Sequence, residues 1–116
     1  MAPPRGPVPS GGPPNMRVLV ETLNFGYEAN GPMTRRAHVG VVGSGDLEVL
    51  IEPSDKPTAQ VRVRTSVDGY AQVWKAVLDR FFARFQHSAK VEINDFGATP
   101  GTVTLRLEQA AEGVRS

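Results

Sequence analysis

A wide apolar stripe between residues 73 and 85 constrains the fold of this 116-residue chain more than any other feature. Its members recur at helical spacing and predict an amphipathic helix with one broad apolar face. They are Val73, Trp74, Val77, Leu78, Phe81, Phe82 and Phe85. Because one helix cannot bury such a face alone, the stripe has to pack against a sheet. Asp68 is the expected N-cap, and Lys75 with Asp79 is an expected i,i+4 pair.

Short strand-like runs, most of them alternating between polar and apolar residues, supply that sheet. In the clearest run, Leu47, Val49 and Ile51 face one way and the acidic residues face the other. Strands are expected at 18–27, 37–42, 46–52, 60–67, 90–94 and 102–108, with a polar tail after them. The sequence therefore predicts an α+β fold of two layers, in which one long amphipathic helix packs on one face of a mainly antiparallel β-sheet.

The first fifteen residues differ in composition from the rest of the chain. Six of the ten prolines lie there, together with three glycines. Such a segment cannot bury enough apolar area to offset the entropy that is lost on ordering. We therefore expect a disordered tail at 1–15 and a single domain at 16–116, with Met16 as an alternative initiator.

Charge and residue types argue against several classes of function. The net charge of +1 carries no signature of nucleic-acid or anionic-membrane binding. The chain lacks cysteine, and His38 and His87 do not have metal-binding spacing. No apolar run is long enough to span a membrane, and no signal-like leader opens the chain. We expect a cytoplasmic protein with no metal site, no membrane span and no nucleic-acid partner.

One serine stands out because glycines flank it. Ser44 lies between Gly43 and Gly45, is followed by Asp46, and falls between two expected strands. This pattern is typical of a hairpin turn. The glycines also remove side chains from both sides of the hydroxyl, which suits a serine that the active site of another protein must approach. A serine hydrolase is poorly supported, because the nucleophile elbow needs a different glycine spacing and a following helix.

Two further features are open to more than one interpretation. Arg62 and Arg64 share one strand face, which is either a solvated surface or a docking face for an acidic partner or phosphates. The string DFGATPG at 95–101 is rich in turn residues and predicts a loop. It is not a kinase signature, because no glycine-rich loop or catalytic loop accompanies it.

Two strings in this order carry a resemblance to a known family. They are GVVGSGD-x-EVL at 40–50 and DFGATPG at 95–101. With these strings, the stretch from about Thr22 to Glu108 resembles the acyl carrier (delta) subunits of malonate decarboxylase. It is similar, more distantly, to the acyl carrier chain of citrate lyase. The proline-rich tail departs from the family pattern, which starts close to Met16.

The resemblance implies a non-catalytic carrier rather than an enzyme. In that family the serine that matches Ser44 carries 2′-(5″-phosphoribosyl)-3′-dephospho-coenzyme A through a phosphodiester, and the carrier holds acetyl and malonyl thioesters. Gly43 and Gly45 would give access to the serine, and Asp46 would support the loop. The implied partners are the transferase (alpha) subunit, the decarboxylase (beta and gamma) subunits and the holo-carrier synthase that modifies Ser44. The alternatives are a citrate-lyase-type carrier, or a small assembly domain in which GSGD is only a turn.

Overall fold

The structure is a computed structural model that describes residues 19–41, 43 and 45–115. The expected tail at 1–15 and the candidate Ser44 lie outside the described residues. Five strands and two helices follow one another along the described part of the chain. They are β1 (Glu21–Glu28), β2 (Ala37–Gly40), β3 (Leu47–Pro53), β4 (Thr58–Thr65), α1 (Ala71–Phe82), β5 (Ala89–Asp95) and α2 (Pro100–Arg115).

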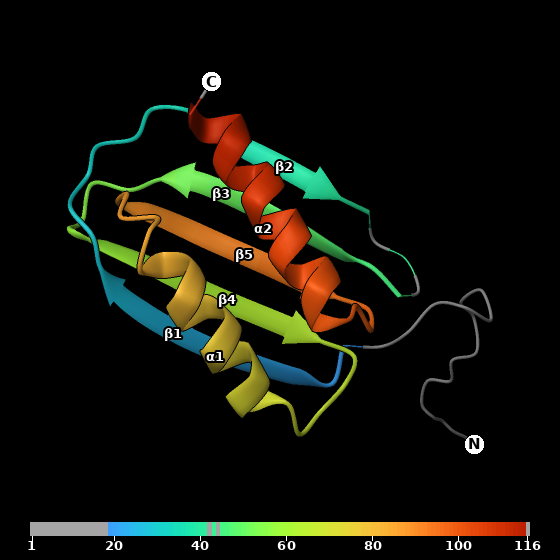
Figure 1. The fold of residues 1–116 in the computed structure, drawn as a ribbon. Coiled ribbons are helices and arrows are strands. Elements are labelled where there is room, and N and C mark those ends of the chain that lie inside the picture. Colours follow the sequence, from blue (N-terminus) through green and yellow to red (C-terminus); the bar gives the residue numbers. More distant parts are fainter. Residues whose placement is uncertain (1–18, 42, 44, 116) are drawn as a thin grey trace, which may run out of the picture.

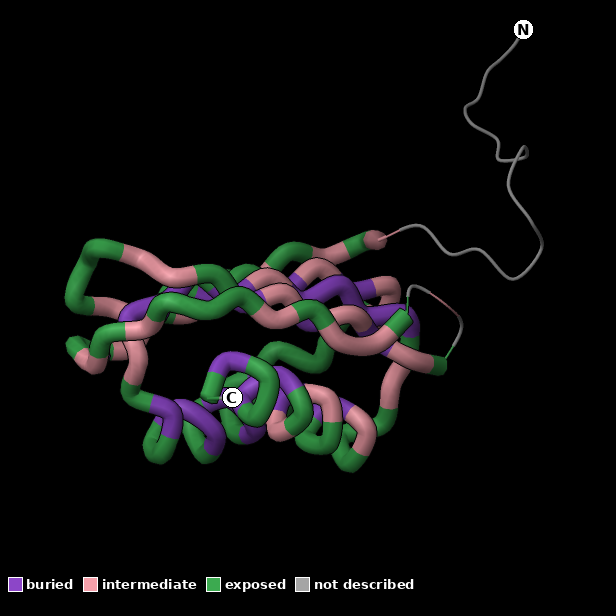
Figure 2. Tube along the Cα trace, turned by 90° about the horizontal axis from the view of Figure 1, so that it is seen from above, coloured by how far each residue is buried: buried purple, intermediate pink, exposed green. Residues whose placement is uncertain are grey.

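The strands form one sheet in the order β1-β4-β5-β3-β2 (Figure 1). Three neighbouring pairs are antiparallel, and only β4 and β5 run parallel. Helix α1 connects this parallel pair, as a crossover between parallel strands requires. Both helices lie on the same side of the sheet, which gives two layers (Figure 2). The predicted class, a two-layer α+β fold with a mainly antiparallel sheet, is confirmed.

The core lies between the sheet and the helices, where period-two residues of the strands meet the stripe of α1. Leu47, Val49 and Ile51 are fully buried, as their alternation predicts. From α1 and the turn after it, the core takes Trp74, Val77, Leu78, Phe81, Phe82 and Phe85. Burial of each large apolar side chain stabilises the fold by about 1.5–3 kcal/mol. Val73 is the one member of the predicted stripe that stays partly exposed.

The second helix corrects the prediction of a single helix, because the expected strand 102–108 lies within α2. Val103 and Leu107 are buried one helical turn apart, whereas Leu105, between them, is 53% exposed. The same buried face continues through Ala110, Ala111 and Val114. Thr99 caps the helix, since its Oγ1 accepts a hydrogen bond from the Thr102 amide at 3.2 Å. The alternation of Val103, Leu105 and Leu107 therefore suggested a strand, whereas the buried residues form a helical stripe that extends into the expected polar tail.

The start of α1 also differs from the prediction. The helix begins at Ala71 after Tyr70, and no side chain caps it, so the expected N-cap Asp68 is wrong. The expected pair is confirmed, because Lys75 Nζ lies 2.8 Å from Asp79 Oδ2. Asp79 also accepts a hydrogen bond of 2.7 Å from the hydroxyl of Tyr27 on β1. This contact fixes the position of α1 against the edge of the sheet.

Candidate functional site

The segment that contains Ser44 connects β2 to β3, which pair antiparallel up to Gly40 and Glu48. The two strands of the predicted hairpin are therefore present, whereas Ser44 itself lies outside the described residues. Gly40 has φ 87°, and a Cβ at this position would collide with the carbonyl oxygen of Leu47. Gly45 has φ 78°, but a Cβ there would meet no atom within 4 Å.

We expect Gly40→Ala to destabilise the fold more than Gly45→Ala. Both substitutions force alanine into a left-handed conformation, which costs roughly 1–2 kcal/mol. Only Gly40→Ala adds a collision with the backbone of β3. Urea unfolding of the two variants measures the difference in the free energy of unfolding. Equal losses of stability would contradict the close approach at Gly40.

The candidate loop, which is the segment that contains Ser44 and connects Gly40 to Leu47, contacts the segment that follows β5. The Gly45 amide donates to the carbonyl of Phe96 at 2.7 Å, and the Phe96 amide donates to the carbonyl of Asp46 at 2.9 Å. The Asp46 amide closes the turn by donating to Gly43 at 3.1 Å. The two family-like strings, far apart in the sequence, are therefore joined by backbone hydrogen bonds at one end of the sheet.

Residues at both ends of the DFGATPG string stabilise the segment that contacts the candidate loop. The Asp95 carboxylate is buried, where Oδ1 accepts the Ala98 amide at 2.9 Å and Oδ2 accepts the Thr65 hydroxyl at 2.8 Å. At the other end, Thr99 caps α2 and Pro100 occupies its first position, where no amide is needed. Asp95 ends β5, the expected loop lies at 96–99, and the last two residues of the string begin the helix.

A side-chain contact adds to the backbone contacts. Arg106 of α2 binds the Asp46 carboxylate with two hydrogen bonds, from Nε to Oδ1 at 3.1 Å and from Nη2 to Oδ2 at 2.8 Å. Gln109 accepts from Arg106 Nη1 at 3.0 Å, and the Leu47 amide donates to Asp46 Oδ1 at 2.7 Å. Such bidentate pairs are geometrically specific. We call this pair the Asp46–Arg106 latch; sequence reasoning did not single out Arg106.

The latch should make stability depend on acid pH. Hydrogen bonds from Arg106 lower the pKa of Asp46 from its ordinary value of 3.8. The latch therefore stabilises the fold above this pH, and its contribution is lost as the pH falls through the lowered pKa. We expect Asp46→Asn to lower the thermal unfolding midpoint at pH 7, and the difference from wild type to shrink below pH 3.8. A difference that is unchanged in acid would contradict this role.

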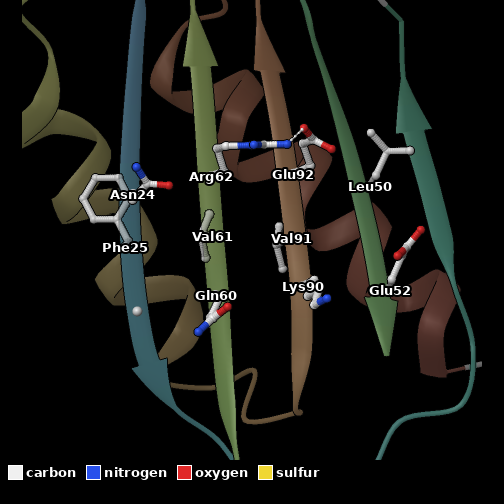
Figure 3. Close-up of a pocket in the computed structure, with 11 residues that line it drawn as sticks. Asn24, Phe25, Leu50, Glu52, Gln60, Val61, Arg62, Lys90, Val91 and Glu92 are labelled. Carbon is white, nitrogen blue, oxygen red and sulfur yellow. Dashed lines mark hydrogen bonds and ion pairs between the residues drawn. The ribbon is translucent and has the colours of Figure 1, made fainter. Parts of the chain in front are cut away.

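Arg62 lies on the face of the sheet that the helices leave open (Figure 3). Arg64, two residues further along β4, shares this face. Arg62 Nη2 is 2.6 Å from Glu92 Oε2, and Arg64 Nη2 is 3.4 Å from the same oxygen. Asn94 accepts a further hydrogen bond of 3.0 Å from Arg64 Nε. A depression of about 640 Å³ crosses this face. Glu92 pairs with both arginines but offsets only one of their two positive charges, so the choice between a solvated surface and a docking face for an acidic partner or phosphates stays a prediction.

The two histidines lie apart. His38 Nε2 is 2.8 Å from Glu48 on the open face, and His87 Nδ1 is 3.3 Å from the carbonyl of Pro32. Among the described residues, no three His, Cys, Asp or Glu side chains gather where they could hold a metal ion. Within the same residues, neither helix is long and apolar enough to cross a membrane.

Comparison with known proteins identifies the family. Residues 34–114 match the family model described as "Malonate decarboxylase delta subunit (MdcD)", an acyl carrier protein. The chain belongs to the malonate decarboxylase acyl carrier family. A malonate decarboxylase acyl carrier protein from Azotobacter vinelandii is 52% identical over 96 residues, which cover 82% of this chain and 97% of the relative. One from Pseudomonas fluorescens is 49% identical with the same coverage.

A solved structure supports the same assignment. The fold matches a chain in the crystal structure of a Pseudomonas malonate decarboxylase hetero-tetramer in complex with malonate, with a TM-score of 0.78 and 47% identity. The match covers 82% of this chain and 99% of that chain. The resemblance seen in the two sequence strings is therefore confirmed, and the malonate decarboxylase family is favoured over the citrate lyase carrier. As a member of this family, the chain is a non-catalytic acyl carrier subunit.

Proposed function

We propose that this acyl carrier holds acetyl and malonyl thioesters on 2′-(5″-phosphoribosyl)-3′-dephospho-coenzyme A, which is esterified to the hydroxyl of Ser44. When bound, this group supplies a thioester whose carbonyl can accept the electron pair that is released on decarboxylation. The observation that supports the site is a loop fixed at its base and open at its glycines. A Cβ on Gly43 or Gly45 would meet no atom within 4 Å, and open space at the residues on both sides of Ser44 supports access by a modifying enzyme.

The chain's own residues act by positioning. Backbone bonds to Phe96 and the Asp46–Arg106 latch hold both the candidate loop and the start of β3. The carboxylate of Asp46 is engaged by Arg106 and its pKa is lowered, which makes it a weak base. Asp46 is therefore suited to supporting the loop rather than to activating the serine. The serine acts as a substrate of the holo-carrier synthase, in keeping with the carrier family.

The proposed partners follow from the family. The similar Pseudomonas chain is part of a malonate decarboxylase hetero-tetramer. We infer that this chain likewise serves a transferase (alpha) subunit and decarboxylase (beta and gamma) subunits, and that its location is cytoplasmic. A tethered thioester reaches successive active sites at high effective concentration, and the intermediate is not lost to solvent.

Intact mass spectrometry tests the attachment. The chain is produced together with the holo-carrier synthase and the enzymes that make its precursor. The proposal expects a mass increase of one prosthetic group, and fragmentation of the modified peptide should place it on Ser44. A chain that stays unmodified with active synthase and precursor present, or a group found on another residue, would overturn the proposal.

A further inference from the structure

A second feature, a cavity, lies beside the candidate loop. It has a volume of about 310 Å³, near the lower end of the range for small-molecule sites. Thr65 and Asp95, at the carboxyl ends of the parallel strands β4 and β5, line its floor. Its sides come from the first turns of α1 and α2, including Trp74 and Val103. Ligands of sheets with parallel strands commonly bind at this end.

The cavity is apolar, and its rim is unusually exposed. Trp74 and Val103 are buried in its wall, whereas Tyr70 and Val73 at its mouth are 52% and 40% exposed. Val41, at the start of the candidate loop, is another exposed large hydrophobic residue. Tyr70 and Val73, two large exposed side chains at the mouth of the cavity, indicate a surface that a ligand or partner covers.

The cavity and the loop share a wall. Gly97 lines the cavity, and a Cβ built on it would lie 4.0 Å from the amide nitrogen of Gly45, the residue after Ser44. The neighbouring Phe96 accepts the hydrogen bond from that same amide. Gly45, the residue that directly follows the proposed attachment point, therefore lies beside the wall of the cavity.

The charge of the lining residues indicates which part of the proposed prosthetic group the cavity can bind. Asp95 is 4% exposed and is the one charged residue among the described residues that line the cavity. Among the described residues that line the cavity, there is no lysine, arginine or histidine. Diphosphate and malonyl carboxylate are anionic and are disfavoured beside this carboxylate. An adenine base is neutral and flat, can pack on Trp74 and Tyr70, and carries an amino group that suits a carboxylate acceptor.

We propose that this cavity, here called the Trp74 cavity, binds the adenine base of the prosthetic group. The inference rests on the proposed attachment at Ser44. Binding the nucleoside near its anchor leaves the pantetheine end free to reach partner active sites. Weak intrinsic affinity is sufficient, because a short tether provides an effective concentration in the millimolar range.

The test uses the unmodified chain, so its result does not depend on whether Ser44 is the attachment point. Trp74 is the single tryptophan of the chain, so all tryptophan emission comes from a residue that lines the cavity. The probes are adenosine, 3′-dephospho-coenzyme A and pantetheine, each titrated separately. We expect the two adenine probes to change Trp74 emission with dissociation constants of roughly 1 mM, and pantetheine to leave it unchanged. No response to adenosine, or a response to pantetheine alone, would overturn the proposal.

A pair of matched variants sharpens the result. Ala98→Leu adds bulk to the cavity wall and should weaken adenosine binding at least about ten-fold. Ala76→Leu makes the same change on an exposed position of α1 outside the lining and should bind as wild type does. If Ala98→Leu does not fold, amide chemical shifts of the wild type with adenosine decide the question. Shifts centred on Tyr70, Val73 and Ala98 support the cavity, and shifts confined to the open face overturn it.

Discussion

Ser44→Ala is expected to fold normally and to keep its unmodified mass in the presence of active holo-carrier synthase and precursor. The substitution removes the oxygen that the proposed phosphodiester needs. It is expected to leave the described contacts at the base of the loop intact, since these come from Gly43, Gly45, Asp46 and their partners. Intact mass spectrometry measures the loss of modification, and thermal unfolding checks the fold. Malonate decarboxylation by the assembled enzyme should fall to background in the same variant.

Ser54→Ala is the matched control for this result. Ser54 follows the end of β3 opposite to the candidate loop, where its Oγ accepts a hydrogen bond from the Lys56 amide at 3.2 Å. This variant should gain the prosthetic group as the wild type does. Modification of Ser44→Ala, or its loss in Ser54→Ala, would contradict the assignment of Ser44.

Arg106→Gln is expected to slow modification without unfolding the chain. The variant loses the charged bidentate partner of Asp46, so the loop keeps its backbone bonds to Phe96 but loses the side-chain contact to α2. Misplacement of a reacting group by ~1 Å can cost about a hundred-fold in rate, and we expect a reduction of roughly ten- to a hundred-fold. The initial rate of mass gain with purified holo-carrier synthase measures this effect.

Two further variants separate positioning from general electrostatics. Arg84→Gln removes an exposed ion pair with Glu108, whose Oε2 lies 2.8 Å from Arg84 Nη2. Glu108 lies on α2, as Arg106 does, but is not part of the latch. It should leave the rate of modification unchanged. The double variant Asp46→Asn/Arg106→Gln should be no slower than Arg106→Gln alone, because both changes break one contact. Equal slowing by Arg84→Gln, or additive slowing in the double variant, would argue against the latch.

The sequence predicted those elements whose buried face shows one clear period. Strand β3 is an example, because Leu47, Val49 and Ile51 alternate without interruption and all three are buried. Helix α2 was missed because Val103, Leu105 and Leu107 fit a strand as well as a helix. The residues that decide between them, Ala110 and Ala111, are small and lie in a polar stretch. A short apolar run is ambiguous by itself, and its continuation determines the structure.

The candidate site, too, has one part that the sequence predicted and one part that it did not. The glycine context of Ser44 is local and visible in the sequence, whereas the contact that supports the loop is not. Asp46 and Arg106 are 60 residues apart, and Arg106 lay on an expected strand. The expected cap Asp68 failed because the turn before α1 ends at Tyr70, two residues later. Local patterns therefore indicated where a group could attach, and the tertiary structure indicated what holds that position.

The hydrogen bonds between Phe96 and the candidate loop have a mechanical consequence. They continue the antiparallel pairing of β3 with β5 beyond Leu47 and Asp95, the last partners in the sheet. Neither strand is at an edge, since β2 covers β3 and β4 covers β5. A pull on the end of an attached arm would thus load interior strands in shear across several hydrogen bonds rather than peel an outer strand. The attachment segment should therefore resist local unfolding when an attached arm is pulled.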